Sequence, residues 1–194
     1  MKGSRGFARY RAIDLALFAG MLCVFECILV TASTRWFPNE PYTVSAAAAV
    51  TSIVMMRWGP WAALHALLGG LAFCVSSGAS LRQYLIYCGG NLFSLAALLV
   101  KRGMGEEAIR TDALKTVFFG LCVAVLMEAG RALLSLLTGA ALSAALGFFL
   151  TDTVTVLFTL VIVWIARRLD GVWEDQAHYL LRLREEQEKE RGGY

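Results

Sequence analysis

Charged residues are almost absent from several long stretches of this sequence, and this restricts the possible fold more than any other feature. Residues 13–34 contain two charged side chains, Asp14 and Glu26, and residues 116–143 contain two, Glu128 and Arg131. A soluble chain of this length needs charged side chains all around its core. Charges held at the ends of long apolar segments are typical of helices that cross a bilayer. We therefore expect an integral membrane protein.

Composition and length set the number of crossings. Apolar residues make up 58% of the chain, against roughly 45–50% in soluble domains, and charged residues make up 17%, against roughly 25%. At roughly 20 residues per crossing, the 194 residues accommodate about six helices and little else. We predict an all-α membrane bundle, residues 1–168, and a charged helical tail, residues 169–194. The expected crossings lie at about residues 12–33, 43–56, 61–75, 83–100, 116–138 and 146–166.

Lysine and arginine residues alternate between the loops in a way that predicts the orientation. With six crossings, one side of the membrane holds the N-terminal leader, Arg57, the 101–115 connector and the tail. That side carries all the lysines and arginines except Arg35, Arg82 and Arg131. Because basic residues are retained in the cytoplasm, both termini are expected there. The first apolar run is too long for a signal peptide and is interpreted as a retained crossing.

Ionisable and polar residues inside the expected crossings are the candidate site. A charge near the centre of a membrane helix costs about 2.5–3.5 kcal/mol, so each one requires a partner or a cavity. Most of these residues fall in the outer half of their crossings, which predicts a cavity that opens to the outside and binds a small polar ligand. The predicted ligand-binding residues are Glu26, Trp36, Tyr84, Tyr87, Asn91, Glu128, Arg131 and Asp152.

Structural roles are the alternative for several of these residues. Glu128 and Arg131 stand three apart on one helix face and can neutralise each other. Asp14 is expected to be a satisfied charge at the interface, and His65 is expected to pack or donate a hydrogen bond. Small residues at Ala12, Ala16 and Gly20 leave room for another helix to approach. The glycine pairs at 69–70 and 89–90 are expected to allow close packing inside the bundle.

The sequence contains no recognisable catalytic motif. There is no His-Glu-x-x-His zinc motif, no Gly-x-Ser-x-Gly elbow and no phosphate-binding loop of the Gly-Lys-Ser/Thr type. The five cysteines all lie in apolar stretches and form no Cys-x-x-Cys pair. We therefore expect no enzyme activity, no cofactor and no metal site.

Three short segments carry a resemblance to a known family. They are the helix start Tyr10-Arg11-Ala12-Ile13-Asp14-Leu15-Ala16, the loop Phe37-Pro38-Asn39-Glu40-Pro41-Tyr42 and the turn Arg57-Trp58-Gly59-Pro60-Trp61-Ala62. Together with six short crossings and internal termini, they make residues 9–168 similar to the substrate-binding S components of energy-coupling factor (ECF) transporters. The charged tail after Arg168 departs from the short ending usual in that family.

The resemblance implies a function and a set of partners. S components capture a vitamin or related micronutrient on the outer side of the bacterial plasma membrane. They then associate with a transmembrane coupling subunit and two cytoplasmic ATPases. In the family, an Ala-x-x-x-Ala pattern on the first helix contacts the coupling subunit, and Ala12 and Ala16 match it, with Gly20 continuing the stripe. Three acidic residues against one arginine favour an amine-bearing ligand, such as a queuosine precursor.

Two other classes of protein remain as alternatives. A membrane scaffold of the cell-shape type resembles S components in fold, and it predicts a stable protein partner and no ligand pocket. An intramembrane enzyme that uses Glu26, Glu128 or Asp152 predicts turnover that depends on one carboxylate.

Overall fold

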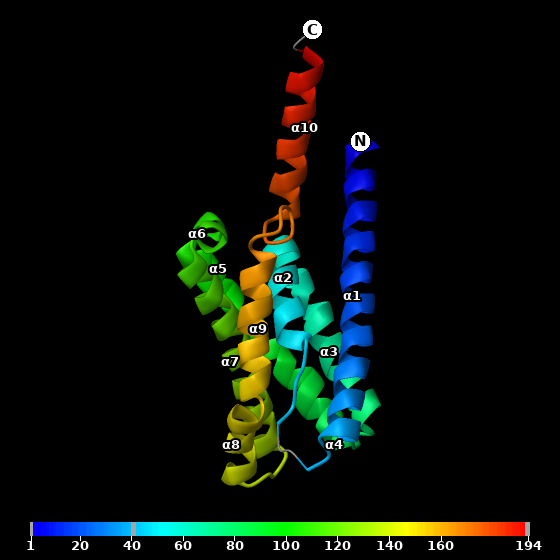
Figure 1. The fold of residues 1–194 in the computed structure, drawn as a ribbon, viewed down its shortest axis with the longest axis vertical. Helices are drawn as coiled ribbons and strands as arrows, with labels where there is room; N and C mark the ends of the chain where they lie inside the picture. Colours follow the sequence, from blue (N-terminus) through cyan, green and yellow to red (C-terminus); the bar gives the residue numbers. More distant parts are fainter. Residues whose placement is uncertain (1, 40–41, 193–194) are drawn as a thin grey trace.

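The fold is entirely helical over the residues that the structure, a computed structural model, describes, which are 2–39 and 42–192 (Figure 1). This confirms the all-α prediction. Glu40 and Pro41 of the aromatic loop lie outside the described residues. The elements in order are α1 (Lys2–Trp36), α2 (Ala47–Trp58), η1 (Gly59–Trp61), α3 (Ala62–Ser77), α4 (Leu81–Tyr84), η2 (Leu85–Gly89), η3 (Leu92–Ala96), α5 (Ala97–Met104), α6 (Glu106–Thr111), α7 (Ala113–Leu137), α8 (Leu142–Thr151), α9 (Thr153–Ala166) and α10 (Gln176–Gly192).

Five helical stretches in the described part of the chain are long and apolar enough to cross a membrane. They are Gly6–Trp36, Ala47–Ser77, Leu81–Met104, Ala113–Leu137 and Leu142–Ala166. Length and composition therefore indicate a multi-pass membrane protein. The start of α1 and the end of α10 lie at the same end of the bundle, which is called the termini end below (Figure 1).

The second of these stretches folds back on itself. Gly59 adopts φ 56° and ψ −120°, a conformation that favours glycine, and it ends α2. Beyond this turn, α3 returns alongside α2, so that a Cβ atom placed on Gly69 would lie 2.6 Å from the Cβ of Ala47. Residues near the start of α2 and the middle of α3 are thus neighbours, and the two helices form an antiparallel hairpin.

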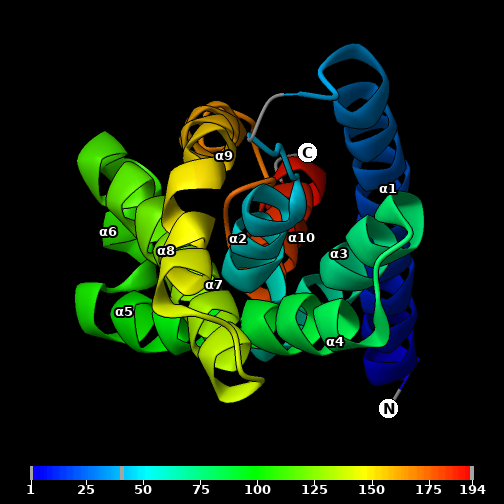
Figure 2. The same cartoon turned by 90° about the horizontal axis from the view of Figure 1, so that it is seen from below.

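Helix α2 is the centre of the bundle. All twelve of its residues are buried, and the other helices surround it when the bundle is viewed along its length (Figure 2). Its side chains Val54, Met55 and Met56 belong to one apolar cluster with Phe119 and Met127 of α7. Such packing holds helices together in lipid through close van der Waals contact, since lipid tails are as apolar as the side chains.

Two predicted crossings differ from the observed helices. The second was predicted to start at residue 43, but residues 43–46 are not helical, and α2 begins at Ala47. The sixth was predicted as one helix from residue 146, whereas α8 and α9 are separated at Asp152. Both predictions were wrong for the same reason, because the 43–46 segment lies against the break at Asp152. The amide of Thr43 donates to the carbonyl of Thr151 at 3.1 Å.

Glycines permit the closest helix approaches, as the sequence predicted for 69–70 and 89–90. A Cβ atom on Gly70 would lie 2.8 Å from the backbone nitrogen of Cys88, and one on Gly90 would lie 2.6 Å from that of Arg131. Gly130 on α7 faces the same contact, because its Cβ would lie 2.3 Å from the Gly90 carbonyl oxygen. Backbone contact at Gly90 and Gly130 sets the position of Arg131.

Candidate functional site

Arg131 is the centre of a buried polar network inside the bundle. Its Nη1 donates to Glu128 at 3.0 Å and to Asp152 at 2.6 Å, and its Nε donates to Asn91 at 2.8 Å. Asn91 in turn donates to the Ala66 carbonyl of α3 at 3.0 Å. The guanidinium carbon also lies 4.9 Å from the centre of the Tyr87 ring. Residues from α3, α7, the 85–96 region and the α8–α9 break therefore meet at one guanidinium.

Glu26 of α1 holds the start of α2. Its carboxylate accepts hydrogen bonds from the Ser45 hydroxyl and, at 3.0 Å, from the Ala46 amide. The Ala47 amide donates to the Ser45 hydroxyl at 3.1 Å. The first amides of a helix have no partner within the helix and favour negative charge. A carboxylate at this buried helix start therefore satisfies donors that lipid would leave unpaired.

A chain of hydrogen bonds joins Glu26 to the arginine cluster. The Ser45 amide donates to the Thr155 hydroxyl at 3.1 Å, and that hydroxyl donates to the Thr43 carbonyl at 3.1 Å. The Thr43 hydroxyl then donates to Asp152. Glu26, Asn91, Glu128, Arg131 and Asp152 thus form one network, although they come from four separate parts of the chain.

The structure does not bring every predicted site residue into this network. Tyr87 contacts it through its ring, which also stacks on Phe73 at 4.5 Å between centres. Trp36 is 74% exposed at the end of α1. It lies ten residues beyond Glu26, or about 15 Å further along the helix axis. Tyr84 is half-buried one turn before Tyr87 and makes no polar contact to the network within the described chain.

The network is strongly acidic for a buried cluster. It contains three carboxyl groups and one guanidinium, and each of these four side chains belongs to a residue that is at most 4% exposed. Buried charges are stable only when they are paired or neutralised. One oxygen, Oε2 of Glu128, is buried and has no hydrogen-bond partner within the described chain. The cluster can therefore accept a further proton or a cationic group at Glu128.

Irregular backbone surrounds Asn91 and Tyr87, the two neutral side chains that contact Arg131. Residues 85–89 form a π-helical turn that includes Tyr87, and residues 92–96 form a 3₁₀ turn directly after Asn91. Single π turns inside helices occur frequently at functional sites because they redirect side chains. Here the π-helical turn contains Tyr87 and the 3₁₀ turn follows Asn91, and both of these side chains contact Arg131.

Three polar residues of the network were missed in the sequence. Thr43, Ser45 and Thr155 carry neutral hydroxyls, which occur in many membrane helices without any ligand role. Thr43 and Ser45 were predicted to lie inside a helical crossing, where their backbone groups would have been paired within the helix. Glu26 and Asp152 have no obvious partner nearby in the sequence. This was the one indication that hydrogen-bond donors from elsewhere in the chain must reach them.

A second polar cluster holds the termini end of the bundle together. Asp14 accepts from Arg57 at 2.6 and 3.0 Å and from the indole of Trp58 at 2.6 Å, so this charge is satisfied, as predicted. Arg57 also donates to the carbonyl of Gly171, in the segment before α10. His65 makes a 3.1 Å hydrogen-bonding contact with the Leu15 carbonyl, which fits the structural role expected for it.

The base of α10 is packed into this end of the bundle. Trp173 is 1% exposed and packs edge-on against Phe119 at 6.1 Å between ring centres. Gln176 is also buried, and it accepts a hydrogen bond from the Tyr10 hydroxyl at 3.0 Å. The predicted tail therefore begins as part of the bundle, and α10 extends outward from it (Figure 1).

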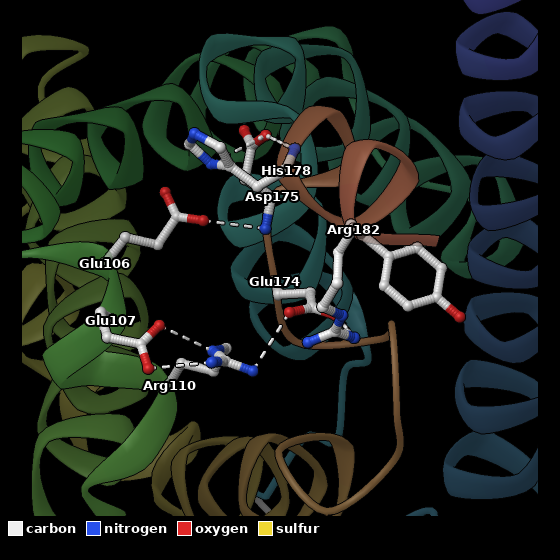
Figure 3. Close-up of a pocket in the computed structure, with 8 residues that line it drawn as sticks. Glu106, Glu107, Arg110, Glu174, Asp175, His178 and Arg182 are labelled. Carbon is white, nitrogen blue, oxygen red and sulfur yellow. Dashed lines mark hydrogen bonds and ion pairs between the residues drawn. The ribbon is translucent and has the colours of Figure 1, made fainter. Parts of the chain in front are cut away.

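A cavity of about 410 Å³ lies between α6 and the base of α10, but its charged groups already have partners (Figure 3). Arg110 binds Glu107 at 2.8 Å and Glu174 at 3.2 Å, and Arg182 binds Glu174 at 3.0 Å. The hydrogen bonds from Arg110 lower the pKa of Glu107 below its ordinary value. Glu106 accepts from the Asp175 amide at 2.8 Å. We interpret this cavity as part of an ionic clasp between α6 and α10.

The predicted partner-docking residues lie on an open face of α1. Ala12, Ala16 and Gly20 are all exposed, and a Cβ atom on Gly20 would meet nothing within 4 Å. Their neighbours Ile13, Leu17 and Met21 are each at least half exposed. The face is therefore apolar and shallow, with room for lipid or another helix to approach the α1 backbone.

Comparisons with known proteins give no family assignment. No protein-family model matches the chain, and no curated protein or solved structure matches it. The class of protein that the fold defines is therefore the multi-pass α-helical membrane protein.

Proposed function

We propose that this protein is the membrane-embedded substrate-binding subunit of an ECF-type importer in the bacterial plasma membrane. In this proposal α2 and α3 cross the membrane separately, which makes six crossings and leaves both termini in the cytoplasm. The hairpin geometry at Gly59 and the common end of α1 and α10 support this topology (Figure 1). The protein captures a vitamin or related micronutrient from outside and performs no chemistry on it.

The observation that carries the proposal is the acidic network around Arg131. Glu128 and Asp152 share the Arg131 guanidinium, Glu26 is joined to them through hydrogen bonds, and Oε2 of Glu128 is buried without a partner within the described chain. A ligand that brings an amine would supply both the missing donor and the missing positive charge. Tyr87, whose ring lies over Arg131, provides an aromatic wall for such a ligand. An amine-bearing micronutrient, for example a queuosine precursor, fits this chemistry.

The open face of α1 supports docking to a transmembrane coupling subunit. Ala12, Ala16 and Gly20 are exposed, so a partner helix can approach the backbone there. The α1 helix also contributes Glu26 to the network and Asp14 to the termini end. A partner bound to this face would therefore contact the same helix that holds the start of α2.

Replacing Ala16 with leucine tests the docking part of the proposal. A bulky side chain on the stripe should prevent close helix approach, so the tagged variant should lose its co-purifying coupling subunit and ATPases. Ligand retention should be unchanged, because Ala16 lies outside the polar network. The measurement is affinity purification from the producing cells, followed by mass spectrometry of the proteins and of any bound small molecule.

The matched control is Ala129→Leu, which enlarges an exposed alanine on α7 instead. This variant should keep all the partners. Recovery of the ATPases with Ala16→Leu at the wild-type level would show that the stripe is not the docking face. Wild-type protein that recovers no ATPase pair at all would contradict the importer assignment.

A membrane scaffold is the second candidate, and one observation favours it. Helix α10 extends beyond the bundle on a firmly packed base, as a helix used for binding a cytoplasmic protein would (Figure 1). The same purification separates the two functions, because a scaffold would recover a stable protein partner through α10 and would carry no small molecule.

A further inference from the structure

A separate cavity lies where α9 ends and the segment before α10 begins. Its volume is about 220 Å³. Its walls include three arginines, one tryptophan and two carboxylates, which are Arg110, Arg167, Arg168, Trp173, Asp170 and Glu174. None of these residues belongs to the network around Arg131 or to the open face of α1, so the proposed importer function does not use this cavity.

Two walls of the cavity contain buried hydrogen-bond donors without acceptors. Nε of Arg167 and Nε1 of Trp173 are both buried, and neither has a partner within the described chain. Both groups can only donate. Nearly all buried polar groups in native proteins are hydrogen-bonded, and an unpaired one indicates an absent water, ion or ligand. A group with oxygen acceptors would satisfy such donors.

The two carboxylates of the cavity, Asp170 and Glu174, are already neutralised by Arg110 and Arg182. Glu174 pairs with Arg110 at 3.2 Å and with Arg182 at 3.0 Å, as Figure 3 shows for the neighbouring clasp. Asp170 pairs with Arg182 at 3.2 Å. Arg110 is held by Glu107 as well. Both carboxylates therefore have an arginine partner, and the charge of Arg110 is compensated by Glu107 and Glu174.

Arg167 and Arg168 keep their positive charge uncompensated. Arg167 donates from Nη1 to the Thr111 carbonyl at 2.8 Å, which is a neutral acceptor. The Arg168 guanidinium lies 3.9 Å from the centre of the Trp164 ring. Neither arginine forms an ion pair with any side chain that the structure describes. The residues that line the cavity therefore carry two uncompensated positive charges and two buried donors without acceptors.

We propose that this cavity binds the oxyanion of a phosphate ester or of free phosphate. Guanidinium groups donate to phosphate oxygens in a fork geometry that few other anions match. The cavity begins directly after Leu142–Ala166, one of the apolar stretches able to cross a membrane. Its Arg168 contacts Trp164, and such aromatic residues are enriched at membrane–water interfaces. That position admits an anionic phospholipid headgroup from the membrane or a soluble phosphate from the aqueous side.

Native mass spectrometry of the full, delipidated chain in neutral detergent tests the proposal. The protein is titrated with dioleoylphosphatidylglycerol, with dioleoylphosphatidylcholine and, in a third arm, with sodium phosphate. We expect the wild type to bind phosphatidylglycerol at least about fivefold more tightly than phosphatidylcholine, since one arginine near a surface contributes on this scale. Arg167→Gln should abolish most of that preference. Competition by sodium phosphate would identify the soluble source for the same site.

Two further variants make the test decisive. Arg102→Gln removes an equal charge from an exposed residue outside the cavity and should leave the preference unchanged. Trp173→Phe keeps an aromatic ring against Phe119 but removes the N–H donor together with the five-membered ring of the indole. It should weaken the preference, and it provides a second cavity variant if Arg167→Gln fails to fold. The proposal is overturned if both cavity variants bind phosphatidylglycerol and phosphate as the wild type does. It is equally overturned if Arg102→Gln loses as much, because the binding would then reflect general surface charge.

Discussion

Replacing Arg131 with methionine should destabilise the protein more than any other single change in the bundle. The substitution leaves Glu128 and Asp152 without the guanidinium that neutralises both, at 3.0 and 2.6 Å. It also removes the donor to the side-chain oxygen of Asn91. Breaking a buried ion pair from one side costs about 3–5 kcal/mol, because the remaining charge stays buried. The free energy of unfolding in mixed micelles, followed by circular dichroism, measures this loss.

Two comparisons separate the charge effect from a general loss of packing. Arg82→Met removes an exposed guanidinium, and its unfolding free energy should change by less than about 1 kcal/mol. The triple variant Arg131→Met, Glu128→Gln, Asp152→Asn removes the stranded charges and should recover part of the loss. If Arg131→Met were as stable as Arg82→Met, the network would not be the buried electrostatic unit described above.

Adding one methyl group at Gly130 should have the second largest effect. The new Cβ of alanine would lie 2.3 Å from the Gly90 carbonyl oxygen and 2.7 Å from the Phe93 side chain. Backbone cannot yield as a flexible side chain does, so α7 must move away from the 85–96 region. Overpacking of this kind costs about 1–3 kcal/mol. Gly130→Ala should also displace Arg131 from Asn91, and ligand binding should weaken together with stability.

Gly147→Ala is the matched control, because nothing lies within 4 Å of a Cβ at that position of α8. Alanine is favoured over glycine inside a helix by about 1 kcal/mol, so this variant should be neutral or slightly stabilised. Thermal melting of the two variants in one detergent measures the contrast. Equal melting temperatures for Gly130→Ala and Gly147→Ala would contradict the close backbone approach.

Hydropathy predicted most of the helices, and it failed where backbone polarity decided the structure. The 116–138 segment is apolar except for a few polar residues such as Glu128 and Arg131, and α7 (Ala113–Leu137) follows it closely. Residues 43–46 carry no charged side chain and were therefore included in a crossing, but their backbone groups bond to Glu26, Thr151 and Thr155. These partners lie far away in the sequence, so no local pattern reveals that the chain is non-helical there.

The candidate site was predictable by residue type but only partly by position. A carboxylate inside an apolar segment needs a partner, and this requirement identified Glu26, Glu128 and Asp152. Depth along a crossing does not show which face of the helix a residue occupies or whether it contacts the other residues of the site. Trp36, for example, is exposed at the end of α1 and lies outside the network. The sequence also could not decide between pairing and ligand binding for Glu128 and Arg131. The structure places both in one network and leaves one Glu128 oxygen unpaired.

Native mass spectrometry of the protein purified from its producing membrane tests the proposed ligand site most directly. The account predicts a co-purified small molecule that bears an amine, with a mass that matches a vitamin or modified-base precursor. Glu128→Gln, which keeps the side-chain volume, should retain the fold and lose most of the bound molecule. A wild-type protein that is empty, and stays empty after incubation with a panel of amine-bearing micronutrients, would contradict the assignment of the Arg131 network as a ligand site.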